Sequence, residues 1–104
     1  MKMLTKDIRK RLPKLYAQEH VEDAKVYVKF FTPWTGWTWF AIEGEPVLDD
    51  DGVEIDFRFF GLVHGLEKEW GYFLLSELEQ VRGPWGLKVE RDLYFNVMPV
   101  SQAR

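Results

Sequence analysis

Seven carboxylates lie in the fourteen residues from Glu43 to Asp56, with no Lys or Arg among them. Clustered carboxylates can bind Ca²⁺ or Mg²⁺, although the spacing of an EF-hand loop is absent. They can also imitate the phosphate charge of DNA toward a basic partner protein, or include acids of raised pKa. A solvated hairpin loop is the simpler interpretation of the same residues. The candidate residues of this acidic loop are Asp49, Asp50, Asp51 and Glu54.

Six large aromatic rings occupy the eleven residues from Phe30 to Phe40. Exposed rings on a sheet stack the bases of single-stranded nucleic acids, and exposed tryptophans are also frequent hot spots of protein interfaces. Trp34, Trp37 and Trp39 are therefore candidates for a binding patch. Packing in the core is the simpler interpretation, since aromatic side chains dominate the cores of small domains.

A basic stripe precedes this aromatic segment. Residues 1–14 hold six Lys or Arg and a single acidic residue, although the whole chain has a net charge of −3. Lys6, Lys10 and Lys14 follow one another at i+4, so they share one side of a helix. They could contact phosphates, but the net charge argues against nucleic acid, whose binding depends on phosphate neutralisation. The solvated side of a surface helix explains the same pattern.

Other chemistries find little support in the sequence. His20 and His64 have no partner at zinc-ligand spacing, and there is no cysteine. Nucleophile-elbow, dinucleotide-binding and P-loop motifs are absent. Two carboxylates such as Asp49 and Glu54 could serve an enzyme as acid and base, but no substrate pocket is identifiable. We therefore expect no catalytic residue, no metal and no cofactor, and the sequence favours a non-enzymatic protein.

The elements that position these residues begin with a helix. Thr5 can cap it, and Leu4, Ile8, Leu12 and Leu15 recur at helical spacing. Pro13 predicts a break, followed by a second short helical turn through Tyr16.

Strand patterns follow this helix. Alternation over 24–31 and 37–43 around the turn Thr32–Gly36 predicts a hairpin. Residues 44–52 are expected to form a loop, and 54–63, 70–75 and 93–97 to form strands. Ser76 and Glu79 make a capping-box pattern for a short helix that ends before Gly83. The predicted fold is a single α+β domain over 1–104. It has an antiparallel sheet of about five strands, an N-terminal helix and one short helix before the last strand.

The compartment can also be predicted. The chain has no cysteine, no apolar signal region and no apolar run near the roughly 20 residues that cross a bilayer. We expect a cytoplasmic protein without membrane association.

Several runs of residues resemble a bacterial family labelled domain of unknown function 2958. They are VKFFTPWTGWTWF over 28–40, FFGLV over 59–63, GYF over 71–73, SELE over 76–79, RGP over 82–84 and ERDLYF over 90–95. Similar proteins are typically encoded on plasmids, integrative elements and phages near genes that handle DNA, and the family has no assigned activity.

The resemblance and the charges together favour one function over another. The first is an interaction protein of mobile elements that acts on host defence or DNA-processing proteins through a protein partner. The alternative is a single-stranded nucleic-acid binder that uses the Trp34–Trp39 hairpin and the basic N-terminal helix.

Overall fold

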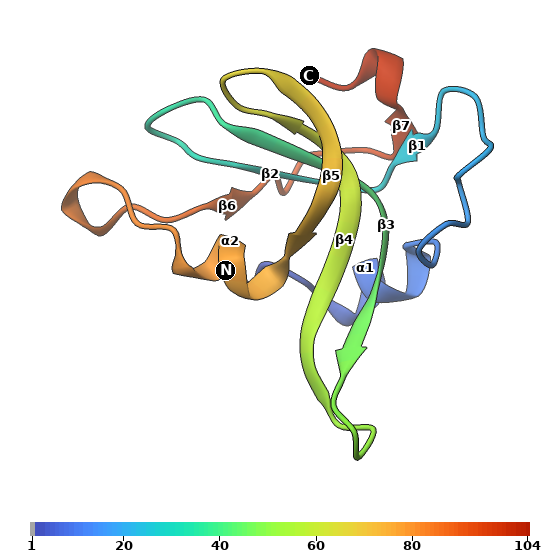
Figure 1. Ribbon diagram of the computed structural model, residues 1–104. Helices are drawn as coiled ribbons and strands as arrows, with labels where there is room; N and C mark the ends of the chain where they lie inside the picture. Colours follow the sequence, from blue (N-terminus) through green and yellow to red (C-terminus); the bar gives the residue numbers. More distant parts are fainter. Residues whose placement is uncertain (1) are drawn as a thin grey trace.

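In the computed structural model, which describes residues 2–104, a five-stranded antiparallel sheet forms the centre of the molecule (Figure 1). Its strands lie in the order β5-β4-β3-β2-β6. A two-stranded sheet pairs β1 with β7. The strands are β1 (Lys25–Val26), β2 (Val28–Phe31), β3 (Thr38–Leu48), β4 (Glu54–His64), β5 (Lys68–Leu74), β6 (Glu90–Arg91) and β7 (Met98–Pro99). The helices are α1 (Lys6–Arg11), α2 (Leu75–Gln80) and two short 3₁₀ turns, η1 (Pro84–Gly86) and η2 (Val100–Gln102). The predicted α+β architecture is confirmed.

The N-terminal helix begins as its sequence predicts. The Thr5 hydroxyl accepts a hydrogen bond from the Ile8 backbone N–H at 3.2 Å, and Leu4 and Leu12 are buried. The helix ends at Arg11, before Pro13. The predicted second helical turn is wrong, because Tyr16 has a φ of 72°. Side chains of β3 bind the backbone of this segment and hold it in a turn instead.

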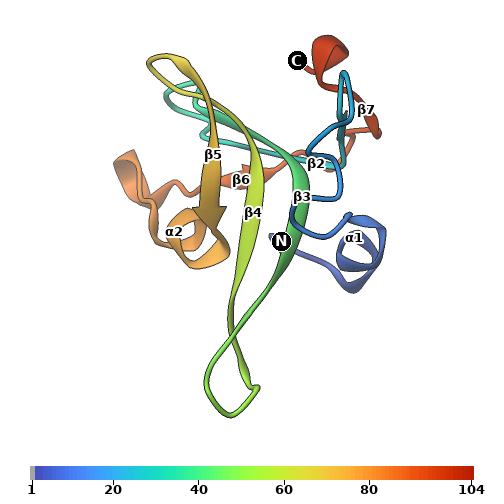
Figure 2. The ribbon, with the colours of Figure 1, turned by 45° about the vertical axis from the view of Figure 1, so that its right-hand side comes forward.

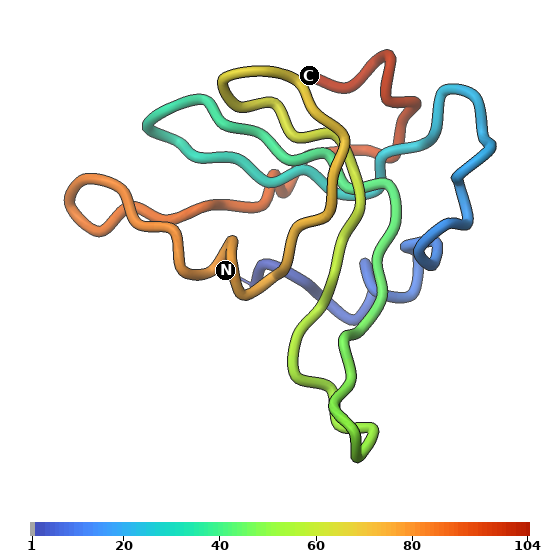
Figure 3. Tube along the Cα trace, viewed as in Figure 1, coloured from blue at the N-terminus to red at the C-terminus, as the bar shows by residue number. Residues whose placement is uncertain are grey.

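The expected loop over 44–52 is wrong in most of its length. The strand β3 continues to Leu48, and only residues 49–53 connect it to β4. Pro46 fits within β3 because β2 pairs with β3 only as far as Ala41, which leaves the distal half of β3 as an edge. The tip of this hairpin projects away from the rest of the chain (Figure 3).

Two predictions near the C-terminus are also corrected. Ser76 does not cap α2, which begins at Leu75; the Glu77 carboxylate accepts the Leu74 backbone N–H at 2.8 Å. The expected strand over 93–97 is replaced by β6 and β7 on either side of it. The Asp92 carboxylate accepts the Tyr94 backbone N–H at 2.9 Å, which favours a turn at this point.

The two faces of the sheet are covered differently. On the helix face, Phe30, Phe59 and Phe73 form one buried cluster with Leu12, at the end of α1, and Leu78 of α2. Figure 2 shows α1 beside β3 and α2 beside β5.

The open face, on the other side of the sheet, has thinner cover. There Phe40 and Ile42 pack with Ala24 and Val26, while Phe60 is only half-buried. No helix among residues 2–104 is long and apolar enough to cross a membrane.

Candidate functional site

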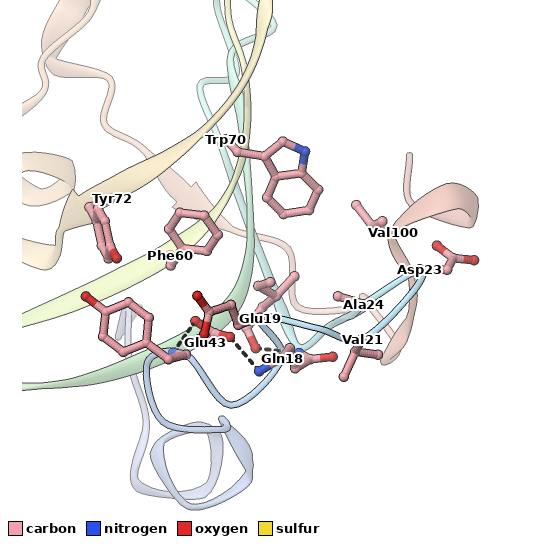
Figure 4. A pocket seen from close by; sticks show the side chains of 12 residues that line it. Gln18, Glu19, Val21, Asp23, Ala24, Glu43, Phe60, Trp70, Tyr72 and Val100 are labelled. Carbon is pink, nitrogen blue, oxygen red and sulfur yellow. Dashed lines mark hydrogen bonds between the residues drawn. The ribbon is translucent and has the colours of Figure 1, made fainter.

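A cavity of about 350 Å³ lies on the open face, between β3, β4, β5 and the segment 16–24 (Figure 4). This volume is at the lower end of the range for ligand pockets, about 300–1,000 Å³. Its size suits one side chain or a small molecule. The cavity is lined by aromatic residues (Tyr16, Phe60, Trp70 and Tyr72), by carboxylates (Glu19, Asp23 and Glu43) and by a few aliphatic side chains.

Strand pairing places the rings. Phe60 lies opposite Tyr72 across β4 and β5, and Leu62 lies opposite Trp70, so all four side chains share the open face. The Phe60 ring stacks with Trp70 at a centroid distance of 5.9 Å and tilts against Tyr72 at 4.9 Å. Trp70 and Tyr72 remain 50% and 51% exposed. A row of half-exposed rings therefore forms one side of the cavity.

A β-bulge in β3 directs Glu43 into the same cavity. The pairing with β4 shifts between Ala41, opposite Gly61, and Glu43, opposite Phe60. Residues opposite each other in a ladder share a face, so Ile42 and Glu43 both lie on the open face. Without the bulge, strict alternation would turn Glu43 toward the helix face. Its side chain is buried, with 3% exposure.

The Glu43 carboxylate organises the segment that covers it. One oxygen accepts the Tyr16 backbone N–H at 2.8 Å and the other accepts the Gln18 backbone N–H at 2.7 Å. The ion pairs found among residues 2–104 do not include Glu43. No Lys, Arg or His is among the described residues that line the cavity. A buried carboxylate without a cation is unusual, since buried charges are ordinarily paired.

The charged residues among those that line the cavity are all acidic. A side-chain hydrogen bond with Tyr16 raises the pKa of Tyr72, as do burial and the nearby carboxylates Glu43 and Glu19. The Ser101 hydroxyl and backbone N–H donate to the Asp23 carboxylate and lower its pKa. Rings and carboxylates placed together are suited to binding a cation.

The three tryptophans that the sequence offered as a binding patch do not share one surface. Trp39 is 9% exposed and belongs to the core of the helix face. Trp37 is 37% exposed, and its ring contacts Trp39 at a centroid distance of 5.9 Å. The Trp34 ring lies against Gly83, in the loop after α2. The three rings therefore do not form one contiguous exposed patch, and their role in binding stays a prediction.

The acidic loop is mostly engaged in local structure. The Asp49 carboxylate accepts the backbone N–H groups of Asp51 and Val53, both at 2.9 Å, and thereby closes the turn. Glu54 forms a two-point ion pair with Arg9, at 2.8 and 2.5 Å, and its pKa is lowered by that hydrogen bonding. Asp50 and Asp51 are exposed at the tip. Over residues 2–104, no group of three or more His, Cys, Asp or Glu is placed to hold a metal ion.

The basic residues Lys6, Lys10 and Lys14 are exposed, and none of them lines the cavity. Their part in binding also stays a prediction.

Most residues of the cavity were missed in the sequence analysis, although one signal pointed to them. In 54–63, Phe57 and Phe59 alternate with Phe60 and Leu62, so this strand is apolar on both faces. A strand of that kind requires cover or a ligand on its second face. The position of Tyr16 over that face has no sequence signal, because it depends on hydrogen bonds to a carboxylate 27 residues away.

Comparison with known proteins gives one match. A family model described as a protein of unknown function, DUF2958, matches residues 3–102. Neither a curated protein nor a solved structure matches the chain.

Proposed function

The chain belongs to this family of unknown function, DUF2958, and on that premise we propose that it is a non-enzymatic interaction protein whose open-face cavity receives a cationic side chain of a partner protein. One observation carries the proposal. Among the described residues that line the cavity, no cation accompanies the buried Glu43 carboxylate, and half-exposed rings line the cavity with it. A cation placed against these rings is attracted by the ring quadrupoles, and the carboxylate adds charge complementarity.

The resemblance to mobile-element proteins supplies the setting. It implies plasmids, integrative elements or phages as carriers. Together with the acidic net charge, it favours host defence or DNA-processing proteins as targets, which we expect in the cytoplasm. Proteins that handle DNA neutralise its phosphates with Lys and Arg, so their surfaces present cationic side chains. A net charge of −3 on this chain favours encounters with such surfaces.

The test is a calorimetric titration of the full chain with a short peptide of alternating Arg, Lys and Ser. We expect binding that weakens as salt rises. Trp70→Ala should weaken it about tenfold, since a partly desolvated cation–π contact contributes about 1–2 kcal/mol. Trp85→Ala is the matched control, because Trp85 is an exposed tryptophan outside the cavity. Equal affinities in all three proteins, or no binding at low salt, would contradict the proposal.

A single-stranded nucleic-acid binder is the second candidate, and the exposure of Lys6, Lys10 and Lys14 favours it. The burial of Trp39 removes one of its three stacking rings. The carboxylates of the open face would repel phosphates from the rings there. An oligonucleotide should quench tryptophan fluorescence at low salt if this candidate is correct, and unchanged fluorescence would exclude it.

A further inference from the structure

Two cations among residues 2–104 each lie beside both a ring and a carboxylate. The Lys29 ammonium lies 5.9 Å from the centre of the Phe31 ring and 3.8 Å from Asp92, and Arg9 makes the closer, two-point contact. The Arg9 guanidinium donates to both oxygens of Glu54, and its central carbon lies 5.1 Å from the centre of the Phe57 ring. This arrangement uses two properties of arginine, a planar fork of donors and a weakly hydrated flat surface. The open-face cavity presents the same two kinds of group, without a cation among the residues that line it.

The rings of the cavity are nearly parallel. The planes of Phe60 and Trp70 differ by 19° and their centres lie 5.9 Å apart, so Trp70 stacks against Phe60 and presents its own half-exposed ring to the cavity. Figure 4 shows Val21, Ala24 and Val100 across from these rings. A quaternary ammonium group is bound best by rings on several sides, as in an aromatic cage. An exposed ring on one side of the cavity, facing aliphatic groups on the other, instead suits a planar cation that stacks on the ring.

The acceptors in the cavity require N–H donors. Each Glu43 oxygen accepts one backbone N–H and keeps further lone pairs. The Glu19 carboxylate lines the same cavity, and one of its oxygens lies 3.8 Å from His20 Nε2 (Figure 4). The Gln18 amide is already committed, since its nitrogen donates to the carbonyls of Lys25 and Ile42. A ligand must therefore bring its own donors, which a trimethylated ammonium lacks. A lysine ammonium has them, but it is strongly hydrated and does not stack.

We infer that the cavity selects arginine: a partner's guanidinium stacks on the half-exposed Trp70 ring and donates to the carboxylates of Glu43 and Glu19. This inference rests on the proposed function, because it names which cationic side chain the cavity receives. It also explains why the bulge matters. Without the shift that turns Glu43 to the open face, the rings would have no buried acceptor beside them.

The experiment titrates blocked tripeptides into the isotope-labelled full chain and follows the Trp70 indole N–H by NMR. The peptides are Gly-Arg-Gly, Gly-Lys-Gly, Gly-trimethyllysine-Gly and Gly-citrulline-Gly, the last a neutral analogue of arginine. We expect the arginine peptide to saturate the shift at a concentration at least about tenfold lower than the lysine peptide, because only arginine both stacks and donates as a fork. The trimethyllysine and citrulline peptides should bind more weakly still.

Two variants locate the binding. Glu19→Gln removes a carboxylate that is exposed, and Trp70→Leu removes the stacking surface while keeping an apolar side chain on β5. For Trp70→Leu the reporter is the Tyr72 backbone N–H. Each variant should weaken arginine binding at least about fivefold, whereas Trp85→Leu should not. Glu43 is left intact because it holds the Tyr16 and Gln18 backbone.

The outcomes separate the two ideas. Lysine binding as tightly as arginine, or trimethyllysine binding more tightly, would overturn the selection of arginine while leaving a cation-binding cavity in place. If no tripeptide shifts the Trp70 resonance, arginine selection is overturned as well. The peptide titration described under the proposed function then shows whether the cavity receives any cationic partner. Binding that survives Trp70→Leu would place the arginine elsewhere on the chain.

Discussion

On the helix face of the sheet, Phe30, Phe59 and Phe73 are buried beneath α1 and α2, whereas on the open face Phe60, Trp70 and Tyr72 keep contact with solvent. Both faces use large rings from the same strands. The rings of the first face pack mainly against one another and against aliphatic side chains. Those of the second lie beside a buried carboxylate, which no close-packed apolar core would include. The comparison shows that aromatic content alone does not separate a core from a binding surface; the neighbours of the rings do.

Adjacent residues of β5 give the strongest test of this difference. Phe73 is 5% exposed and stacks on Phe59 at 5.3 Å, whereas Tyr72 is half-exposed. Phe73→Ala should lower the free energy of unfolding by about 3–5 kcal/mol through lost burial and a cavity. Tyr72→Ala should lower it by about 1 kcal/mol or less, since it removes a partly solvated ring. Urea unfolding measures both, and equal losses would mean that the open face is also a core.

A pair of glycines tests how closely the strands approach beneath these rings. Gly61 of β4 lies opposite Gly71 of β5. A Cβ on Gly61 would overlap the carbonyl oxygen of Phe40, whereas a Cβ on Gly71 would meet nothing. Gly61→Ala should therefore destabilise the protein by about 1–3 kcal/mol or more, because the backbone of β3 must move. Gly71→Ala is the control and should be neutral or slightly stabilising. Similar unfolding midpoints for the two variants would show that β3 moves without cost.

The helix α1, which covers part of the helix face, can be destabilised at its N-terminus. Thr5 caps α1, which brings Leu4 and Leu12 to the core. Thr5→Ala should lower the free energy of unfolding by about 1 kcal/mol, and Thr5→Ser should restore most of it. Thermal unfolding measures both variants. Peptide binding in the open-face cavity should not change, because Thr5 does not line it. A loss of binding equal to that of Trp70→Ala would mean that the two faces are coupled.

The sequence predicts the covered face better than the open one. Short-range signals such as the Thr5 cap, the turn at Thr32–Gly36 and the strand alternation place α1 and the hairpin of β2 and β3 correctly. Pro46 and the three aspartates predict a loop over 44–52, yet an edge strand accommodates Pro46, and only the aspartates lie in the turn. The cavity depends on a bulge at Ile42 and on the backbone of Tyr16 meeting Glu43. Those features arise from contacts between segments that are distant in the sequence, so no local sequence pattern predicts them.

Two serine–aspartate pairs carry the smallest expected effect. The Ser76 hydroxyl donates to Asp56 at 2.5 Å and joins α2 to β4, while Ser101 donates to Asp23 at 2.6 Å at the rim of the cavity. Burial raises the pKa of Asp56, but hydrogen bonds from Ser76 and the Phe57 backbone outweigh it and leave the pKa lowered. The Ser101 hydrogen bonds lower the pKa of Asp23.

A lowered folded-state pKa fixes the sign of the pH dependence. The stabilisation is present in full above the unfolded-state pKa of Asp, about 3.9, and is lost as pH falls through the lower folded-state value. Ser76→Ala should therefore reduce stability near neutral pH by about 1 kcal/mol or less, and its curve should meet the wild-type curve once the pH falls below the lowered folded-state pKa of Asp56. The stability curve of Ser101→Ala should also meet the wild-type curve at low pH. Its loss of stability near neutral pH should be smaller than that of Ser76→Ala, because Asp23 is more solvated than Asp56. Urea unfolding from pH 2 to 7 measures both variants. If the free energies of unfolding of variant and wild type differ by the same amount across that range, the ionised aspartates do not cause the difference.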